Sequence, residues 1–180
     1  CSTGLIGLKN DRGDLVAGVD ACAAALSTEG GEDAAEAIMT TDSVSKRVVV
    51  EGSGWTVGGM AKGAGMLAPQ LATMLVVLTT DAKITPAEAD RALRAATRVS
   101  FDRLDSDGCM STNDTVTLLA SGASGITPTL EDFTEALTRA CTDLAMQLLA
   151  DAEGADHEIA ITVLNAASED EAVEVARSVA

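Results

Sequence analysis

A short apolar run rich in β-branched residues occupies residues 71–80. It is bounded by turn-forming residues, and a run of this length and composition is typical of a fully buried strand. The preceding residues 58–70 are rich in glycine, which lets the backbone approach a ligand closely. Thr73 lies where this loop enters the strand, a suitable place for a reactive side chain because the strand would fix it while the loop leaves access. Most threonines at strand starts only pack or cap, so the pattern alone leaves both roles open.

Five other segments show helical periodicity or a helix-start signal. The clearest start is at Thr85, which can cap a helix, with Pro86 suited to the first helical position and Glu88 completing a capping box. The longest segment is expected to bury a stripe at helical spacing. That stripe consists of Phe133, Leu137, Cys141, Leu144 and Leu148. The expected helices cover residues 14–26, 32–39, 85–99 and 129–150, and a last helix begins at Ser168.

Strand composition occurs in four further segments. The glycine-containing residues 51–54 between two of them predict a hairpin connection. The last segment alternates Ile and Val with smaller residues, as a half-buried strand does. These expected strands cover residues 1–7, 44–50, 55–60 and 159–164.

Residues 111–120 carry conflicting signals. Thr112 and Asp114 favour a capped helix, whereas the β-branched residues at 115–117 favour a strand, and we expect a helix. Strands and helices mixed in one unit indicate an α+β fold with α/β layers, in a single compact domain over residues 1–180.

The chain carries 28 acidic and 12 basic residues, a net charge of −16, which disfavours binding to nucleic acid or to an anionic membrane surface. Only three residues are aromatic, so stacking platforms for bases are lacking as well. The four cysteines are widely spaced and there is one histidine, so no zinc motif is formed and no metal is expected. No apolar run reaches the roughly 18–20 residues of a membrane span. These features predict a cytoplasmic protein with reduced thiols.

The glycine-rich segment reads GGMAKGAGMLAP at residues 58–69 and is followed by Ala72-Thr73-Met74-Leu75. Other motifs flank it in a fixed order: CSTGLIG at 1–7, IMTTD at 38–42, FDRLD at 101–105, STNDT at 111–115 and DAEG at 151–154. This ordered set spans nearly the whole chain. It resembles the ornithine acetyltransferase family, the bifunctional glutamate N-acetyltransferases of arginine biosynthesis.

The resemblance implies helices flanking two packed sheets, the αββα arrangement of enzymes with an N-terminal nucleophile. It also implies transfer of an acetyl group from N2-acetylornithine to glutamate through an acetyl-threonine, after autocatalytic cleavage of the Ala72–Thr73 bond. Members of the family are about twice as long as this chain. We therefore expect the central part of a longer precursor, with residues 1–72 ending an α chain and 73–180 beginning a β chain, and a homo-oligomer of αβ units.

Site residues follow from the same resemblance. Thr73 would be the nucleophile, and Thr3 with Gly4 would form the oxyanion hole, since a hydroxyl and a backbone N–H can stabilise charge on an acyl oxygen. Substrate contacts are implied for Thr40, Lys62, Thr73 and Glu153. Four of these positions also have an ordinary structural interpretation: a strand-end turn at Thr3 and Gly4, an exposed loop lysine at Lys62 and a solvated acid at Glu153.

A threonine hydroxyl needs an adjacent base to act as a nucleophile. Once the preceding bond is cut, the α-amine of Thr73 would lie within reach of its own Oγ, and its ordinary pKa of about 7.7–8 suits proton transfer near neutral pH. No cofactor is expected, and whether acetyl-CoA serves as a co-substrate is open. Two alternatives stay open too: an aminopeptidase or amidase of related fold with an N-terminal nucleophile, and an inactive structural module.

Overall fold

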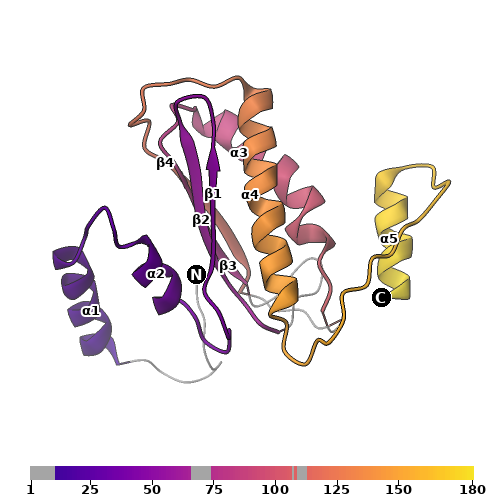
Figure 1. Cartoon of the computed structure of the whole chain (residues 1–180), viewed down its shortest axis with the longest axis horizontal. Helices are drawn as coiled ribbons and strands as arrows, with labels where there is room; N and C mark the ends of the chain where they lie inside the picture. The colour runs from indigo at the N-terminus through magenta and orange to yellow at the C-terminus, as the bar shows by residue number, and fades with distance from the viewer. Residues whose placement is uncertain (1–10, 66–73, 107, 109–112) are drawn as a thin grey trace.

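The computed structural model of the protein describes residues 11–65, 74–106, 108 and 113–180. Within them, one mixed sheet has the strand order β1-β2-β3-β4, in which β1, β2 and β3 are antiparallel and β4 is parallel to β3. Helix α4 runs along β1 and β2, and α3 packs against α4 (Figure 1). The prediction of an α+β fold is confirmed, and the second sheet that the resemblance implies stays a prediction. These elements are β1 (Lys46–Glu51), β2 (Thr56–Lys62), β3 (Leu75–Thr80), β4 (Thr115–Ala120), α3 (Pro86–Val99) and α4 (Leu130–Ala150).

The predicted hairpin joins β1 to β2. Val50 pairs with Val57 and Glu51 with Thr56, and the turn closes where the Gly52 N–H donates to the Trp55 carbonyl at 2.8 Å. Strand β2 then continues two residues beyond the predicted end. Lys62 was expected in the glycine-rich loop and is instead the last residue of β2.

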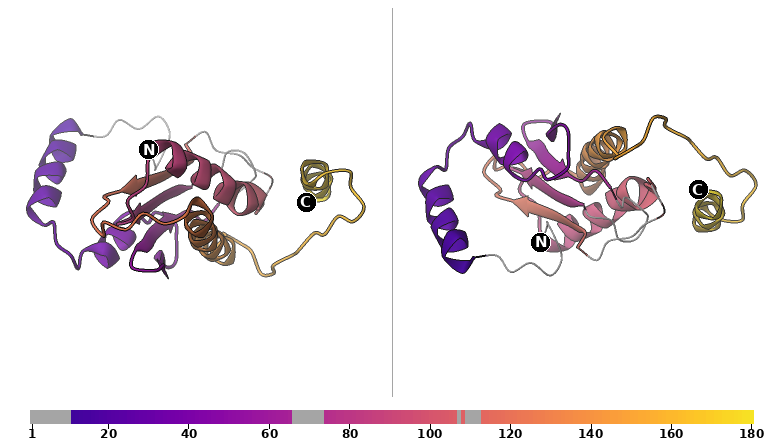
Figure 2. Two further views of the ribbon diagram at one scale, coloured as in Figure 1. Left: turned by 90° about the horizontal axis from the view of Figure 1, so that it is seen from above. Right: turned by 90° about the horizontal axis from the view of Figure 1, so that it is seen from below.

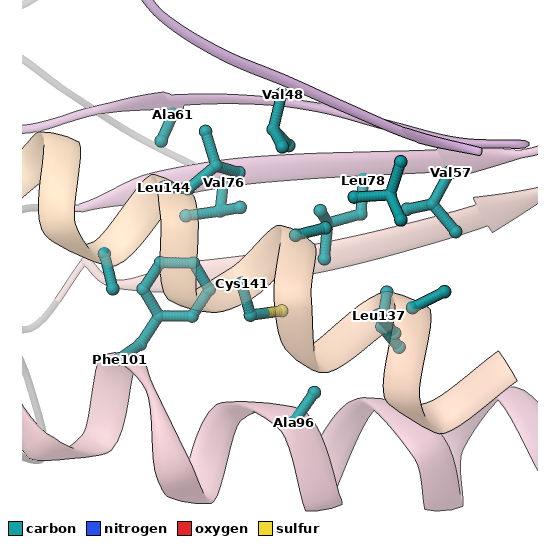
Figure 3. Packing of buried hydrophobic residues seen from close by; sticks show 14 of the residues in the cluster. Val48, Val57, Ala61, Val76, Leu78, Ala96, Phe101, Leu137, Cys141 and Leu144 are labelled. Atoms are coloured by element: carbon teal, nitrogen blue, oxygen red, sulfur yellow. The ribbon is translucent and has the colours of Figure 1, made fainter. Parts of the chain in front are cut away.

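The hydrophobic core lies between the sheet and the two long helices, and both helices are on the same side of the strands (Figure 3). All five predicted stripe residues of α4 are fully buried, so that prediction is confirmed. Gly59 allows α4 this close to the sheet, because a Cβ there would lie 2.7 Å from Leu78 Cδ2 and 3.1 Å from Leu144 Cδ1. The capping box predicted at Thr85 and Glu88 is also present.

Replacing Leu144 with alanine should destabilise the fold. Its side chain is 0% exposed and packs in the core, so truncation should lower the free energy of unfolding by about 3 kcal/mol, within a range of roughly 2–5. Denaturant unfolding monitored by circular dichroism measures this. Met146→Ala on the same helix is the control. Met146 is 40% exposed, so its truncation should lower the free energy of unfolding much less. Equal losses in the two variants would contradict the assigned core.

Two predictions of local structure are wrong. Residues 115–120, expected in a helix, form β4 and pair with β3 from Leu75–Thr115 to Thr80–Ala120. The strand preference of the β-branched residues outweighs the helix signal there, because β3 provides hydrogen-bond partners for their backbone groups. Residues 159–164 form no strand, and Ile159 is 80% exposed. Alternation alone does not make a strand without a partner for its backbone hydrogen bonds.

The remaining helices lie outside this core, except for the short 3-10 helix after α3, whose Phe101 packs within it. Helix α1 (Arg12–Ala24) and helix α5 (Glu169–Val179) have no buried residues, and they flank the central layers at opposite ends (Figure 2). Both were predicted as helices, as was α2 (Gly31–Ala37), and these predictions are confirmed. A short 3-10 helix, η1 (Phe101–Arg103), follows α3. None of the described helices combines the length and hydropathy needed to cross a membrane. The strand end expected at residues 1–7 lies outside the described residues.

Candidate functional site

Lys62 and Thr40 meet at the end of β2. The Lys62 side chain is buried, with 1% of the residue exposed, and Nζ donates to Thr40 Oγ1 at 3.4 Å. Burial lowers the pKa of Lys62, although the carboxylates of Asp42 and Asp114 act in the opposite direction. The residue is therefore not the exposed loop lysine that the pattern alone favours. It is an ammonium group held in a site of low solvent access, where an additional anion would stabilise its charged form.

Asp114 holds the beginning of β3. Its Oδ1 accepts from the Met74 N–H at 2.8 Å, and the Met74 carbonyl accepts from the Thr115 N–H at 3.0 Å. Met74 is the residue bonded to Thr73, and the next residue, Leu75, pairs with Lys62 across the sheet. Burial raises the pKa of Asp114 to about 6, although the Met74 N–H and the Lys62 charge oppose this rise.

Glu153 follows α4 and lies against the glycine-rich segment. Its backbone N–H donates to the Ala64 carbonyl at 2.5 Å. Its carboxylate is near Gly65, since a Cβ on that glycine would be 3.7 Å from Glu153 Oε2. The side chain is exposed, so a bound molecule can reach it. The segment at Glu153 is thus joined to the residues that directly follow Lys62.

The structure therefore brings together three residues that are far apart in the sequence: Thr40, Lys62 and Glu153 lie on segments that meet where β2 ends. The other predicted site residues, Thr3, Gly4, Ala72 and Thr73, lie outside the described residues.

Four charged residues at this site were not assigned roles from the sequence: Asp42, Lys46, Asp114 and Asp151. Three of them are the acidic members of the motifs at 38–42, 111–115 and 151–154, a signal that could have identified them. Lys46 stands in none of these motifs, and only its position on β1 could have pointed to it.

Among the described residues, no group of three or more His, Cys, Asp or Glu side chains is arranged to hold a metal ion. Cys141 is buried in the core, and burial raises the pKa of its thiol to about 12, so a reactive thiolate at this position is disfavoured. The arrangement places a buried lysine and an exposed carboxylate on neighbouring segments, two groups whose chemistry suits ligands of opposite charge.

Comparison with known proteins points to one family. The model of the ArgJ family matches residues 1–180. The arginine biosynthesis bifunctional protein ArgJ of Streptomyces coelicolor is 63% identical over 180 residues, covering 100% of this chain and 47% of that protein. The protein of the same name from Mycobacterium leprae is 58% identical over 183 residues, covering 100% of this chain and 45% of that protein. The chain spans about half the length of the curated relatives that it matches.

A solved structure agrees with the fold. The crystal structure of the arginine biosynthesis bifunctional protein argJ from Bacillus halodurans has a TM-score of 0.52 and 39% identity to this chain. The match covers 57% of this chain and 50% of that one.

Proposed function

Because this chain belongs to the ArgJ family, we propose that its protein is an acetyltransferase that moves the acetyl group of N2-acetylornithine to glutamate in arginine biosynthesis. The observation that carries the proposal is the meeting of Thr40, Lys62 and Glu153 at the end of β2, beside the start of β3. The name of the relatives, arginine biosynthesis bifunctional protein, agrees with it.

Thr73 is the proposed nucleophile. Its Oγ attacks the acetyl carbonyl of acetylornithine, the α-amine of Thr73 takes the hydroxyl proton, and ornithine leaves with a proton on its amine. The amine of glutamate then attacks the acetyl-threonine and releases N-acetylglutamate and the free hydroxyl. Thr3 and Gly4 stabilise the oxyanion in both half-reactions. The free α-amine requires that the Ala72–Thr73 bond has been cut, with Thr73 Oγ attacking the Ala72 carbonyl and water opening the ester.

Substrate recognition fits the charges of the described residues. Acetylornithine and glutamate both carry an α-carboxylate, and the buried Lys62 ammonium beside Thr40 is a suitable partner for it. Glu153 is exposed and carries a carboxylate, so it suits the side-chain ammonium of ornithine. The depressed pKa of Lys62 supports this role, because a bound carboxylate would offset the desolvation of the ammonium.

The proposal extends to the assembly. The α and β chains of one precursor would remain together and form a homo-oligomer of αβ units in the cytoplasm. The reaction as written needs no cofactor, and acetyl-CoA would enter only as an alternative acetyl donor.

Two measurements on the full-length protein test the function. Intact-mass analysis should find two chains, the second beginning Thr-Met-Leu-Val, and ping-pong kinetics should be seen for exchange between acetylornithine and glutamate. Release of amines from peptide amides, assayed in parallel, should be absent. A single uncut chain without exchange activity would contradict the proposal, and peptide amidase activity alone would favour an aminopeptidase.

Asp114 gives a prediction for pH dependence. As a carboxylate it accepts from the Met74 N–H and faces Lys62, and with a pKa of about 6 it becomes protonated as the pH falls through that value. The α-amine of Thr73 must also be unprotonated to act as the base, so kcat/KM should already fall below its pKa of about 7.7–8, and the fall should steepen below about pH 6 as Asp114 becomes protonated. Asp114→Asn should remove the steeper part, because the amide oxygen still accepts from Met74 but does not titrate. The measurement is a pH–rate profile from about pH 5 to about pH 9; an identical profile in both proteins would assign the steeper part to another group.

A further inference from the structure

Lys46 is a fully buried lysine between two carboxylates. Its Nζ lies 2.7 Å from Asp42 Oδ1 and 2.5 Å from Asp151 Oδ2, and its side chain is 0% exposed. Burial acts to raise the pKa of both carboxyl groups, but the hydrogen bonds that they accept outweigh it and hold both values below the ordinary range. The three residues come from the loop before β1, the first position of β1 and the end of α4. We call them the Asp42–Lys46–Asp151 triad.

One end of the triad is bonded to the segments that carry Thr40 and Lys62. Asp42 Oδ1 accepts from the Gly63 N–H at 2.6 Å, directly after Lys62, and Asp42 Oδ2 accepts from the Thr40 N–H at 3.1 Å. Both bonds are made by backbone groups, so they fix the course of the main chain rather than a single rotamer. Asp42 thus sets the position from which the Lys62 and Thr40 side chains meet.

The other end is bonded to the segment that carries Glu153. Asp151 Oδ2 accepts from the Ser43 N–H at 3.0 Å, and Asp151 Oδ1 accepts from the Ser43 hydroxyl. Asp151 is two residues before Glu153. Lys46 bonds to both carboxylates, so it connects the Thr40 and Lys62 segments to the Glu153 segment through one buried contact, with Asp42, and one largely buried contact, with Asp151.

Stability alone is a poor reason for such an arrangement. Taking three charges out of water is unfavourable, and apolar residues of similar volume often stabilise a fold at least as well. Apolar residues make no directional hydrogen bonds, whereas each carboxylate here accepts hydrogen bonds from particular N–H groups. Building on the proposed function, we infer that the Asp42–Lys46–Asp151 triad is a positioning device that fixes the substrate-binding residues Thr40, Lys62 and Glu153 relative to one another.

The test is Lys46→Met in the full-length protein, assayed well below its measured unfolding temperature. A displacement of about 1 Å in substrate-positioning groups lowers rates by about 100-fold, so we expect kcat/KM to fall by about that factor, mainly through higher KM for both acetylornithine and glutamate. Cleavage into two chains should persist, because Asp114 and strand pairing hold Met74 independently. Amide hydrogen exchange should quicken at Thr40 and Gly63 and stay unchanged within β3.

Arg94→Met is the matched control. It also removes a cation from an ion pair, but Arg94 and Asp90 lie on the surface of α3 with side chains 79% and 61% exposed, so KM should not change. If Lys46→Met does not fold, Asp151→Ala takes its place, since it removes the acceptors for Ser43 and Lys46 at the Glu153 end while Lys46 keeps its ion pair with Asp42. A folded variant with unchanged KM for both substrates would overturn the inference and leave the proposed function standing. A wild-type protein without exchange activity would overturn both.

Discussion

Thr73→Ala is expected to leave the protein as one uncut chain with no measurable acetyl exchange. Removal of the hydroxyl eliminates both the group that would attack the Ala72 carbonyl and the group that would carry the acetyl. Loss of a nucleophile lowers turnover by about 10⁴-fold or more in enzymes that depend on covalent catalysis. Intact mass and the exchange assay measure the two effects separately.

Thr73→Ser is the matched control, because serine keeps a hydroxyl at the same position. It should still be cut, more slowly if the methyl group of threonine helps to orient Oγ, and it should retain exchange activity. Cleavage or exchange in Thr73→Ala at the wild-type rate would show that another residue is the nucleophile.

The sequence predicted best what depends on local interactions. Helix α4 is the clearest case, since its buried stripe follows from a period of 3.6 residues within one segment. Strand β4 could not be predicted in this way. Its backbone is satisfied by β3, about 40 residues earlier in the chain, and nothing within residues 111–120 contains that information.

The same difference between local and long-range information applies to the site residues. Thr40, Lys62 and Glu153 were predicted as site residues through the resemblance, because their motifs occur in order along the chain. Lys46 was missed although β1 offered a signal. It alternates with Val48 and Val50, and the side chains at these three positions point to the same, buried face of the strand. A lysine in phase with buried valines requires a buried counter-charge, and those partners, Asp42 and Asp151, become visible only in the folded chain.

Lys62→Met should give the second large effect: activity should fall strongly, whereas the free energy of unfolding should not fall. In the proposed function Lys62 binds the α-carboxylate of both substrates, and removing one partner of a buried charged pair weakens binding by roughly 2–5 kcal/mol. We expect kcat/KM to fall by about 100-fold or more for acetylornithine and glutamate alike, measured by steady-state kinetics. Lys83→Met is the control: Lys83 is exposed and should have no effect on KM.

Stability should respond to Lys62→Met differently. Burial lowers the pKa of Lys62 below 10.5, which means that the unfolded chain holds this proton more tightly than the folded chain does. The charged lysine therefore destabilises the fold below its folded pKa, and that penalty is relieved only as the pH rises through that pKa toward 10.5. Methionine fills a similar volume without a charge, so the free energy of unfolding at pH 7 should stay the same or rise while activity falls. A variant that loses stability and activity together would assign Lys62 to the fold, and one with unchanged KM would remove it from substrate binding.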